Sequence, residues 1–432
     1  MTPDDQSPWD LDLEPVAGGG LMHRRAFLVG GALAAGAAGI ASVRAEGGIA
    51  SDQPHSMRTP GSPLRAYGQP SKYEEGVVRT VLQPYGELAP GAGVSMTPLQ
   101  AMHGTITPNG LHFNRSHNGV PDIDPEQHKL LIHGLVERPL IFTLDTLMRY
   151  PTVTRTLFIE CSGNSFFNSN LFPEAMQVPV GMIHGLVSSA EWTGIPLSAL
   201  LDEAGIDPAA TWVLAEGADA AGMSRSVPLS KCLDDAMIAL YQNGERVRPE
   251  QGYPMRLLLP GFEGNTSVKW LRRIKLTDGP THTKDETSKY TELQIDGISK
   301  QFTLTMEVKS TITRPALGVA MSGPGLYEVS GLAWSGHGTI EKVEVSADGG
   351  ASWAEAAIEG QPQPHALVRF RAPWQWDGGP TVLQSRAFDS EGNVQPNRSD
   401  WSRLYAAGQL YHCNAIQAWS IAANGEIKNV FS

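Results

Sequence analysis

Residues 155–170 read "RTLFIECSGNSFFNSN", an apolar run that passes directly into a loop of small polar residues. Such a run, bounded by turn-forming residues, predicts a buried β-strand. Cys161 stands where the predicted strand ends, and it is one of only three cysteines in 432 residues. A thiol in this position is most often an inert core residue. A nucleophile and a metal ligand are the two other interpretations.

The overall composition is that of a globular protein with more than one core. Hydrophobic residues make up 41% and charged residues 18% of a chain long enough for two or three domains. The net charge of −12 argues against a nucleic-acid-binding protein, which usually carries a basic surface. Cys161, Cys232 and Cys413 are far apart and form no CxxC or CxxCH motif. This spacing argues against a clustered zinc site, a covalently attached c-type haem and a disulfide framework, and leaves at most one distant disulfide.

The N-terminus has the features of an export signal. Residues 22–45 read "MHRRAFLVGGALAAGAAGIASVRA", in which Arg24 and Arg25 precede an apolar run and an A-x-A-like end. We predict a twin-arginine signal peptide over residues 1–45, cleaved after Ala45, and hence a periplasmic protein. The run of about 16 residues is shorter than a membrane-spanning helix. An uncleaved membrane anchor is the alternative, and we expect no membrane span in the mature protein.

Two folded domains are predicted after an extended arm. Residues 46–95 are rich in Pro, Ser and Gly and predict the arm. Residues 96–307 mix short apolar runs with short helical patterns, which predicts an α+β domain. The expected strands are 129–136, 154–161 and 255–261; the expected helices are 143–150, capped by Thr143 or Asp145, and 196–206, closed by Gly205.

From residue 308 to residue 432 the pattern becomes purely β. "TIEKVEVSADGGASWAEA" predicts two strands joined by a tight turn at Asp348, Gly349 and Gly350, with Trp353 on the second strand. A further turn is expected at residues 389–393. Short strands with turn signals about every ten residues indicate an Ig-like β-sandwich.

Four short motifs carry the chemistry. They are "HFNRSHNGVPDIDP" (112–125), "IECSGNS" (159–165), "EQGYPMRLLLPGFEGNTSVKWLRR" (250–273) and "TSKYTEL" (287–293). Each alone has an ordinary structural interpretation. Together they supply Arg, His and Lys side chains with glycine-rich backbone, which suits an anionic phosphate ligand. A lone cysteine suits a metal whose other ligands come from a cofactor.

With these motifs in this order, the chain resembles the sulfite oxidase family of molybdenum enzymes from about Thr97 to the C-terminus. The resemblance implies a molybdopterin-binding domain, an Ig-like dimerisation domain and a molybdenum–molybdopterin cofactor. It implies that Cys161 is the metal ligand and that Tyr290 and Arg115 join it in catalysis. It also implies a set of cofactor-binding residues, of which Asp219 lies in a loop that is shorter here: Phe113, Asn114, Arg115, His117, Asp219, Gln251, Arg256, Ser267, Val268 and Lys269.

Three positions depart from the pattern of sulfite oxidases. Phe166 and Ala422 stand where that family has pocket arginines, and Gln251 stands where it has a histidine. Each missing guanidinium removes a charged contact worth roughly 1.5–3 kcal/mol, so free sulfite is expected to bind poorly. We expect Phe166 to line a less charged channel.

Within the family, the amino-acid sequence is most similar to SoxC-type sulfane dehydrogenase molybdenum subunits. That resemblance implies oxidation of sulfane sulfur on a SoxYZ-type carrier protein, by oxygen transfer from molybdenum. It implies a SoxD-type c-type cytochrome as electron acceptor, since this chain has no haem motif, and a homodimer within a heterotetramer. The alternatives are a sulfite dehydrogenase, a sulfoxide-reducing relative and, more distantly, a non-enzymatic exported Ig-like binding module.

Overall fold

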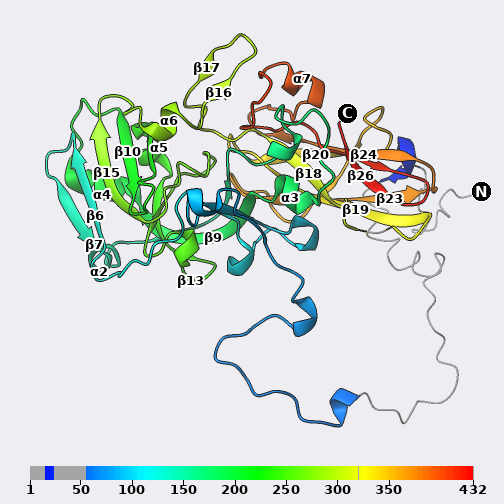
Figure 1. Ribbon diagram of the computed structural model, residues 1–432, viewed down its shortest axis with the longest axis horizontal. Helices are drawn as coiled ribbons and strands as arrows, with labels where there is room; N and C mark the ends of the chain where they lie inside the picture. The colour runs from blue at the N-terminus through cyan, green and yellow to red at the C-terminus, as the bar shows by residue number, and fades with distance from the viewer. Residues whose placement is uncertain (1–14, 24–54, 320, 432) are drawn as a thin grey trace, which may run out of the picture.

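The computed structural model describes residues 15–23, 55–319 and 321–431. The chain is elongated, with one half built mainly from the cyan and green elements and the other mainly from the yellow to red strands (Figure 1). The twin-arginine pair and the expected cleavage site lie outside the described residues. No helix in the described ranges is long and apolar enough to cross a membrane.

The outer sheet of the first half has five strands in the order β11-β10-β15-β6-β7, and only the β15–β6 pair is parallel. Short helices lie beside it, and Thr143 caps the first of them by accepting from the Thr146 amide, as predicted. The elements are β6 (Lys129–Gly134), β7 (Leu140–Thr143), α2 (Leu144–Leu147), α4 (Leu197–Ala204), β10 (Trp212–Gly217), β11 (Ser224–Pro228), α5 (Leu229–Asp234) and β15 (Leu271–Thr277).

The inner sheet carries the opening stretch of sequence. Its order is β13-β12-β9-β8, and β14 pairs with β12. The predicted strand before Cys161 is β8, which is fully paired with β9 along its length. The third predicted strand, 255–261, is shorter than expected. The bounds are β8 (Val153–Glu160), β9 (Val187–Pro196), β12 (Met237–Gln242), β13 (Glu245–Arg246) and β14 (Arg256–Leu258).

A small three-stranded sheet connects the arm to the site. It consists of β3 (Thr80–Leu82), β4 (Gly93–Met96) and β5 (Asn114–Ser116). Before β3, the described part of the arm is almost entirely exposed and contains only the short 3-10 turns His55–Met57 and Lys72–Glu74. It forms the long loop below the body of the molecule in Figure 1.

The second half is a β-sandwich, as predicted. The turn at 348–350 follows β20, and Asp389 closes the second predicted turn by accepting from the Glu391 and Asn393 amides. Trp353 lies one residue before its strand. One sheet has β18 (Lys309–Arg314), β19 (Gly325–Trp334), β22 (Ala357–Ile358) and β23 (Val368–Trp376); the other has β20 (Ile340–Ser346), β21 (Ala354–Glu355), β24 (Thr381–Asp389), β25 (Ala418–Ile421) and β26 (Ile427–Val430).

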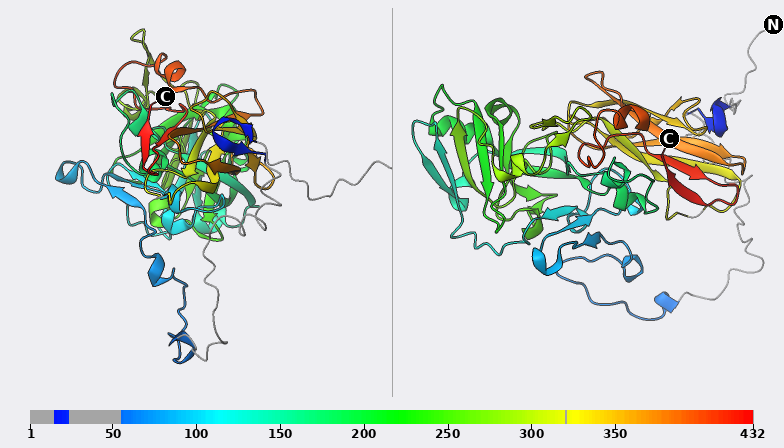
Figure 2. Two further views of the ribbon diagram at one scale, coloured as in Figure 1. Left: turned by 90° about the vertical axis from the view of Figure 1, so that its right-hand side faces the viewer. Right: turned by 45° about the horizontal axis from the view of Figure 1, so that its top comes forward.

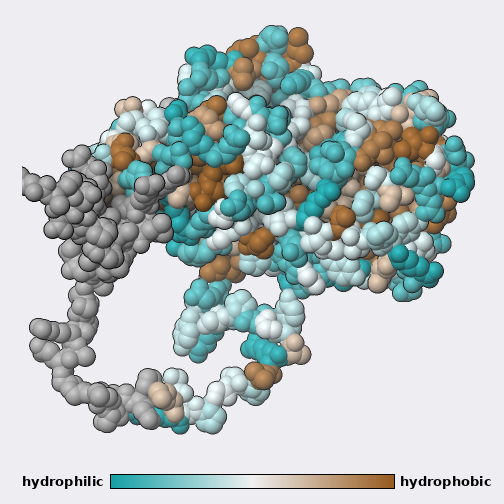
Figure 3. Space-filling model, turned by 180° about the vertical axis from the view of Figure 1, so that it is seen from behind, coloured by the Kyte–Doolittle hydropathy of each residue, from teal (hydrophilic) through white to brown (hydrophobic). Residues whose placement is uncertain are grey.

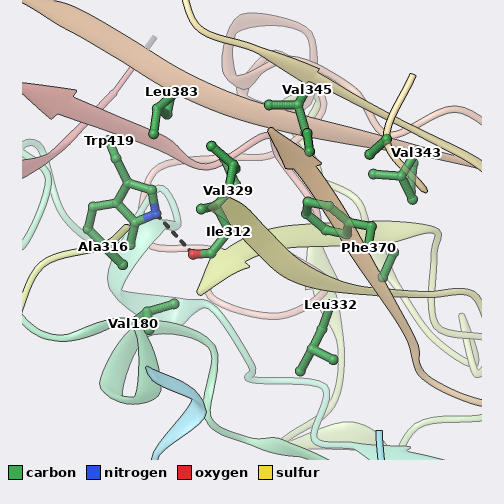
Figure 4. Packing of buried hydrophobic residues seen from close by; sticks show 14 of the residues in the cluster. Val180, Ile312, Ala316, Val329, Leu332, Val343, Val345, Phe370, Leu383 and Trp419 are labelled. Carbon is green, nitrogen blue, oxygen red and sulfur yellow. Dashed lines mark hydrogen bonds between the residues drawn. The ribbon is translucent and has the colours of Figure 1, made fainter. Parts of the chain in front are cut away.

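The apolar core of the sandwich includes residues of the first half, which also has apolar clusters of its own. Val180 of α3 (Val180–His184) lies against sandwich residues, and Trp419 Nε1 donates to the Ile312 carbonyl 3.1 Å away within the same cluster (Figure 4). Phe158 of β8 belongs to this cluster too. Continuous burial of this kind fixes the sandwich against the strand that leads to Cys161. The remaining elements, α6 (Lys284–Thr287), the hairpin β16 (Glu292–Leu293) and β17 (Ser299–Lys300), and α7 (Arg398–Ser402), lie along the top in Figure 1.

Candidate active site

A pocket lies where the loops of the first half converge. Every site residue predicted from the sequence lines it, so residues from four separated motifs meet in one place. The lining residues are His112, Phe113, Asn114, Arg115, Ser116, His117, Ile159, Cys161, Asp219, Met223, Gln251, Arg256, Gly264, Asn265, Ser267, Val268, Lys269, Trp270 and Tyr290.

Cys161 is fixed at the end of β8 by its own backbone. Its amide donates to the Leu186 carbonyl at 2.9 Å, and its carbonyl accepts from the Asn164 amide at 2.8 Å. Burial raises the pKa of the Cys161 thiol, while the nearby Arg115 guanidinium lowers it. All three cysteines are free, and the other two are buried away from the pocket. Cys161 is thus the thiol that faces the site.

Two buried cations form one wall of the pocket. Lys269 Nζ donates to the side chain of Asn114 and to the carbonyls of Arg115 and Glu250, both at 3.1 Å. Arg256 donates to the Ser267 carbonyl at 2.9 Å and to Gln251. Burial lowers the pKa of Arg256 to about 9 and that of Lys269 well below its usual value.

The cationic wall is incompletely satisfied. Arg256 Nε, a donor, is buried and has no hydrogen-bond partner; neither has His112 Nε2, which is an acceptor because Nδ1 donates to the Phe113 carbonyl. Within the described residues, Arg115, Arg256 and Lys269 form no ion pair. Buried cations and donors left without anionic partners are costly unless a ligand supplies the acceptors. The wall therefore suits a polar anionic ligand.

Tyr290 also lines the pocket. Its hydroxyl lies 3.1 Å from His117 Nε2, and the Arg225 guanidinium lies 5.0 Å from its ring centroid. Burial raises the pKa of Tyr290 well above its usual value. Burial, together with the Arg115 charge, lowers the pKa of His117 to about 3. Both groups are therefore neutral at pH 7, and the Arg115 charge acts on both.

The sandwich holds the cysteine loop from behind. The Glu160 carboxylate, fully buried, accepts from Lys309 Nζ at 2.7 Å, Trp334 Nε1 at 2.6 Å and Asn164 Nδ2 at 2.9 Å. The amide of His412 donates to the Ser162 carbonyl at 2.9 Å. Residues on both sides of Cys161 are thus held by the second half of the molecule.

The comparisons with known proteins agree on one family. Residues 117–285 match the oxidoreductase molybdopterin binding domain, and residues 300–419 match the Mo-co oxidoreductase dimerisation domain. The solved structure of the sulfane dehydrogenase SoxCD from Paracoccus pantotrophus superposes with a TM-score of 0.85 at 42% identity, over 89% of this chain and 98% of that one. The chain belongs to the sulfite oxidase family of molybdenum oxidoreductases.

Curated relatives in the family are longer proteins. Nitrate reductase [NADH] 1 of Arabidopsis thaliana is 30% identical over 72% of this chain and 38% of its own length. Mitochondrial sulfite oxidase of Rattus norvegicus is 30% identical over 68% of this chain and 57% of its own length. The chain therefore spans less than two thirds of the length of either relative.

The pocket fits the molybdopterin cofactor of this family. A pyranopterin carries a phosphate and hydrogen-bonding groups of both kinds, which suit the unpartnered donor Arg256 Nε, the unpartnered acceptor His112 Nε2 and Lys269, which has no ion pair. Asp219, whose loop is shorter than the family pattern, still lines the pocket. Cys161 lines the same pocket and is the thiol available as a ligand for the metal.

One expectation about the departures from sulfite oxidases is wrong. Phe166 does not line the pocket: its ring packs on Phe167, with centroids 4.0 Å apart, and on Phe172. Ala422 lies in the turn between β25 and β26, where its amide donates to the Glu426 carbonyl. The sandwich reaches the site through a different segment, in which Tyr411 lies 5.5 Å from Tyr290 between ring centroids.

Sequence reasoning also missed members of the site. His112 and Asn265 line the pocket, and Asn265 Nδ2 donates to Ser162 Oγ at 3.2 Å. Both lie inside the quoted motifs, so the signal was present. His112 lies in the loop that leads into β5 and ends at Phe113. Whether its side chain reaches the pocket depends on the path of that loop, which the sequence does not show. Asn265 was missed because the glycines near it in the sequence indicate only a turn.

Proposed function

We propose that this chain is the molybdenum subunit of a sulfane dehydrogenase. The observation that carries the proposal is the charge of the substrate side of the pocket, where Arg115 stands among the neutral groups Tyr290 and His117. A free sulfite dianion needs more positive charge than one guanidinium provides. A sulfur atom attached to a carrier thiol has less charge and suits this site.

The chain's own residues have distinct roles in the proposed reaction. The bound molybdenum cofactor supplies two-electron oxygen-atom transfer to sulfur. Lys269, Arg256 and Ser267 would bind the cofactor phosphate, and Cys161 would ligate the metal. Arg115 would stabilise negative charge as it develops on the oxygen joined to sulfur.

Tyr290 would orient the substrate. When His117 donates from Nε2, the Tyr290 oxygen accepts and its own O–H is left to point at the sulfur substrate. The ring cannot swing away freely, because it lies between the Arg225 guanidinium and Tyr411. The high pKa of Tyr290 keeps this hydroxyl a hydrogen-bond donor through the neutral pH range.

Protein partners complete the proposal. We propose a c-type cytochrome as electron acceptor and a sulfur-carrier protein as substrate. An apolar patch formed by exposed side chains supports a protein-sized partner: Leu171, Leu293, Ile295, Ile298 and Leu404 are each at least 42% exposed. Three of them lie on the β16–β17 hairpin, which begins two residues after Tyr290, and apolar atoms gather at the top of the molecule in Figure 3.

A steady-state assay tests the substrate. The purified holoprotein is mixed with oxidised cytochrome c and either free sulfite or a carrier protein bearing a persulfide. We expect reduction of cytochrome c with the persulfide and a much lower kcat/KM with sulfite. Efficient turnover of free sulfite would overturn the sulfane assignment and favour a sulfite dehydrogenase.

We also propose export to the periplasm by the twin-arginine route. The support is the sequence around Arg24 and Arg25 and the A-x-A-like site at Ala45. Cell fractionation tests it: the wild-type chain should accumulate in the periplasm, and Arg24→Lys combined with Arg25→Lys should leave it in the cytoplasm. Equal export of both chains would contradict the proposal.

A further inference from the structure

The segment just before the twin-arginine pair is folded onto the far end of the molecule. It consists of β1 (Pro15–Ala17), a turn of three glycines (Gly18–Gly20) and β2 (Leu21–Met22). We call residues 15–22 the docking segment. β2 pairs antiparallel with β23 of the sandwich, with Leu21 opposite Trp374. In Figure 1 the segment is the dark blue element at the right, beside the orange strands.

The three glycines lie in close contact with the sandwich, and a Cβ atom at any of them would come too close to a sandwich atom. A Cβ on Gly18 would lie 2.2 Å from Asp348 Oδ2, one on Gly19 2.0 Å from the Ala347 carbonyl oxygen, and one on Gly20 2.0 Å from the Gln375 carbonyl oxygen. Gly19 and Gly20 also have φ of +68° and +86°, which glycine adopts most readily. Glycine is thus needed at Gly19 and Gly20 for this contact, whereas the atoms nearest to Gly18 belong to the side chains of Asp348 and Ser352.

Specific bonds hold the glycine turn. The Gly18 amide donates to Ser352 Oγ at 2.6 Å, and Trp374 Nε1 donates to the Gly19 carbonyl at 2.7 Å. Trp374 is fully buried, so without the segment its indole N–H would lose this partner. The sandwich therefore presents a donor that the segment satisfies.

Leu21 anchors the segment in the core. Its side chain is 0% exposed and belongs to the same apolar cluster as Trp374 and Trp376. β22 pairs with β23 at Phe370 and Arg371, and β2 continues along that edge at Trp374. The segment thus extends the cover over an edge strand, which is otherwise a site for unwanted pairing.

We propose that the sandwich carries a binding site for the docking segment of its own chain, and that this site is occupied in the precursor. The site needs β23, the 346–352 turn and the core around Leu21 to be assembled, so it forms only on the folded sandwich. The proposal goes beyond the proposed function, since it concerns neither the pocket nor its substrate. Cleavage after Ala45 would leave the segment held by these contacts alone.

Docking within one chain is sterically allowed. Residues 24–54 join the segment to the rest of the chain, and a chain of that length can reach roughly 100 Å at about 3.3 Å per residue. The same contacts with a second copy of the chain are the competing arrangement, and the test below separates the two.

Hydrogen exchange measured by mass spectrometry on the uncleaved full-length chain tests the proposal. Peptides covering residues 15–23 and 372–377 should be protected in the wild type at every protein concentration. Leu21→Asp should lower protection of both peptides at least about tenfold, since a buried carboxylate cannot replace the leucine. Gly19→Val should also lower the protection of both peptides, because its side chain would collide with the Ala347 carbonyl.

Val16→Asp is the matched control, because Val16 is 47% exposed on the same segment. It should leave both peptides protected. Exchange over β19 should stay unchanged in every variant, which shows that the sandwich remains folded. Full exchange of residues 15–23 in the wild type, or unchanged protection in Leu21→Asp, would overturn the proposal. Protection that appears only at high protein concentration would assign the docking to a second copy and overturn the intramolecular site.

Discussion

At the scale of single residues, context decides what Cys161 does. The thiol by itself predicted an inert core residue, and the four motifs together predicted a metal ligand. The structure brings every predicted residue of the site into one pocket around it. This part of the site was predictable because each motif carries its residues at fixed short spacing on one loop or strand end.

Side-chain direction was not predictable in the same way. Phe166 follows the cysteine loop closely, and its ring packs with Phe167 and Phe172. Sequence position gives no information on which way a side chain points from the short 3-10 helix Phe166–Asn168. Burying three aromatic rings together stabilises the packed arrangement over one in which Phe166 lines the pocket.

His184 predicts a pH dependence of stability. It is buried, with Nδ1 at 2.7 Å from Ser165 Oγ and Nε2 at 3.0 Å from Gln417 Oε1, and burial lowers its pKa to about 3. The unfolded chain takes up this proton below pH 6.5, whereas the folded chain does not. The free energy of unfolding should therefore fall as the pH drops from about 6.5, by up to about 1.4 kcal/mol per pH unit from this residue.

Urea unfolding at several pH values between 7 and 4 measures this effect in the cofactor-free chain. His184→Gln keeps a polar side chain and removes the titrating group. Its unfolding free energy should fall less steeply with decreasing pH than that of the wild type. Parallel slopes for the two chains would show that His184 does not titrate in this way.

At the scale of elements, the strand before the cysteine and the turns of the sandwich were predicted well. β8 and α4 are periodic and bounded by turn residues, so local sequence defines them. The strand predicted at 255–261 is longer than β14, because Pro260 and Gly261 prevent the pairing with β12 from continuing. The approach of the sandwich to the pocket was not predicted, because it runs through an irregular segment, 410–412, that no strand pattern marks.

The ion pair between Lys309 of the sandwich and Glu160 before the cysteine loop predicts that a substitution of Lys309 lowers the stability of the fold strongly. Its ammonium group is 2% exposed and pairs with Glu160 at 2.7 Å. Lys309→Met would leave the Glu160 carboxylate buried with only neutral donors. We expect a loss of about 3–5 kcal/mol in the free energy of unfolding, measured by denaturant titration.

Lys342→Met is the control for this substitution. Lys342 lies on β20 and pairs with Glu344, but its side chain is 38% exposed. Exposed pairs contribute little, so the control should change stability by less than about 1 kcal/mol. Equal effects of the two substitutions would mean that Lys309 has no special role under the cysteine loop.

At the scale of the whole molecule, the two-part architecture followed from the change of pattern near residue 308. The docking of residues 15–22 on the sandwich was not predictable, because those residues lie within the predicted signal peptide and contain no strand-length apolar run. Contacts between segments 350 residues apart depend on the shape of the folded sandwich, which local sequence does not contain.

The apolar hairpin beside the site predicts separate effects on large and small reactants. Ile295→Asp and Ile298→Asp change side chains that are 70% and 64% exposed, so folding should be unaffected. We expect kcat/KM with the protein partners to fall about tenfold or more, while turnover with a small artificial electron acceptor stays unchanged. Val394→Asp, at 47% exposure on the sandwich, is the control and should change neither. Equal activity of all four chains with protein partners would move the docking surface elsewhere.

X-ray absorption at the molybdenum edge tests the central claim most directly. The chain is produced with molybdate in a host that makes the cofactor, as wild type and as Cys161→Ser. We expect about one molybdenum per wild-type chain and one sulfur neighbour fewer around the metal in the variant, because the Cys161 thiolate is lost. A wild-type chain that takes up no molybdenum in this host, or an unchanged number of sulfur neighbours in Cys161→Ser, would contradict the account.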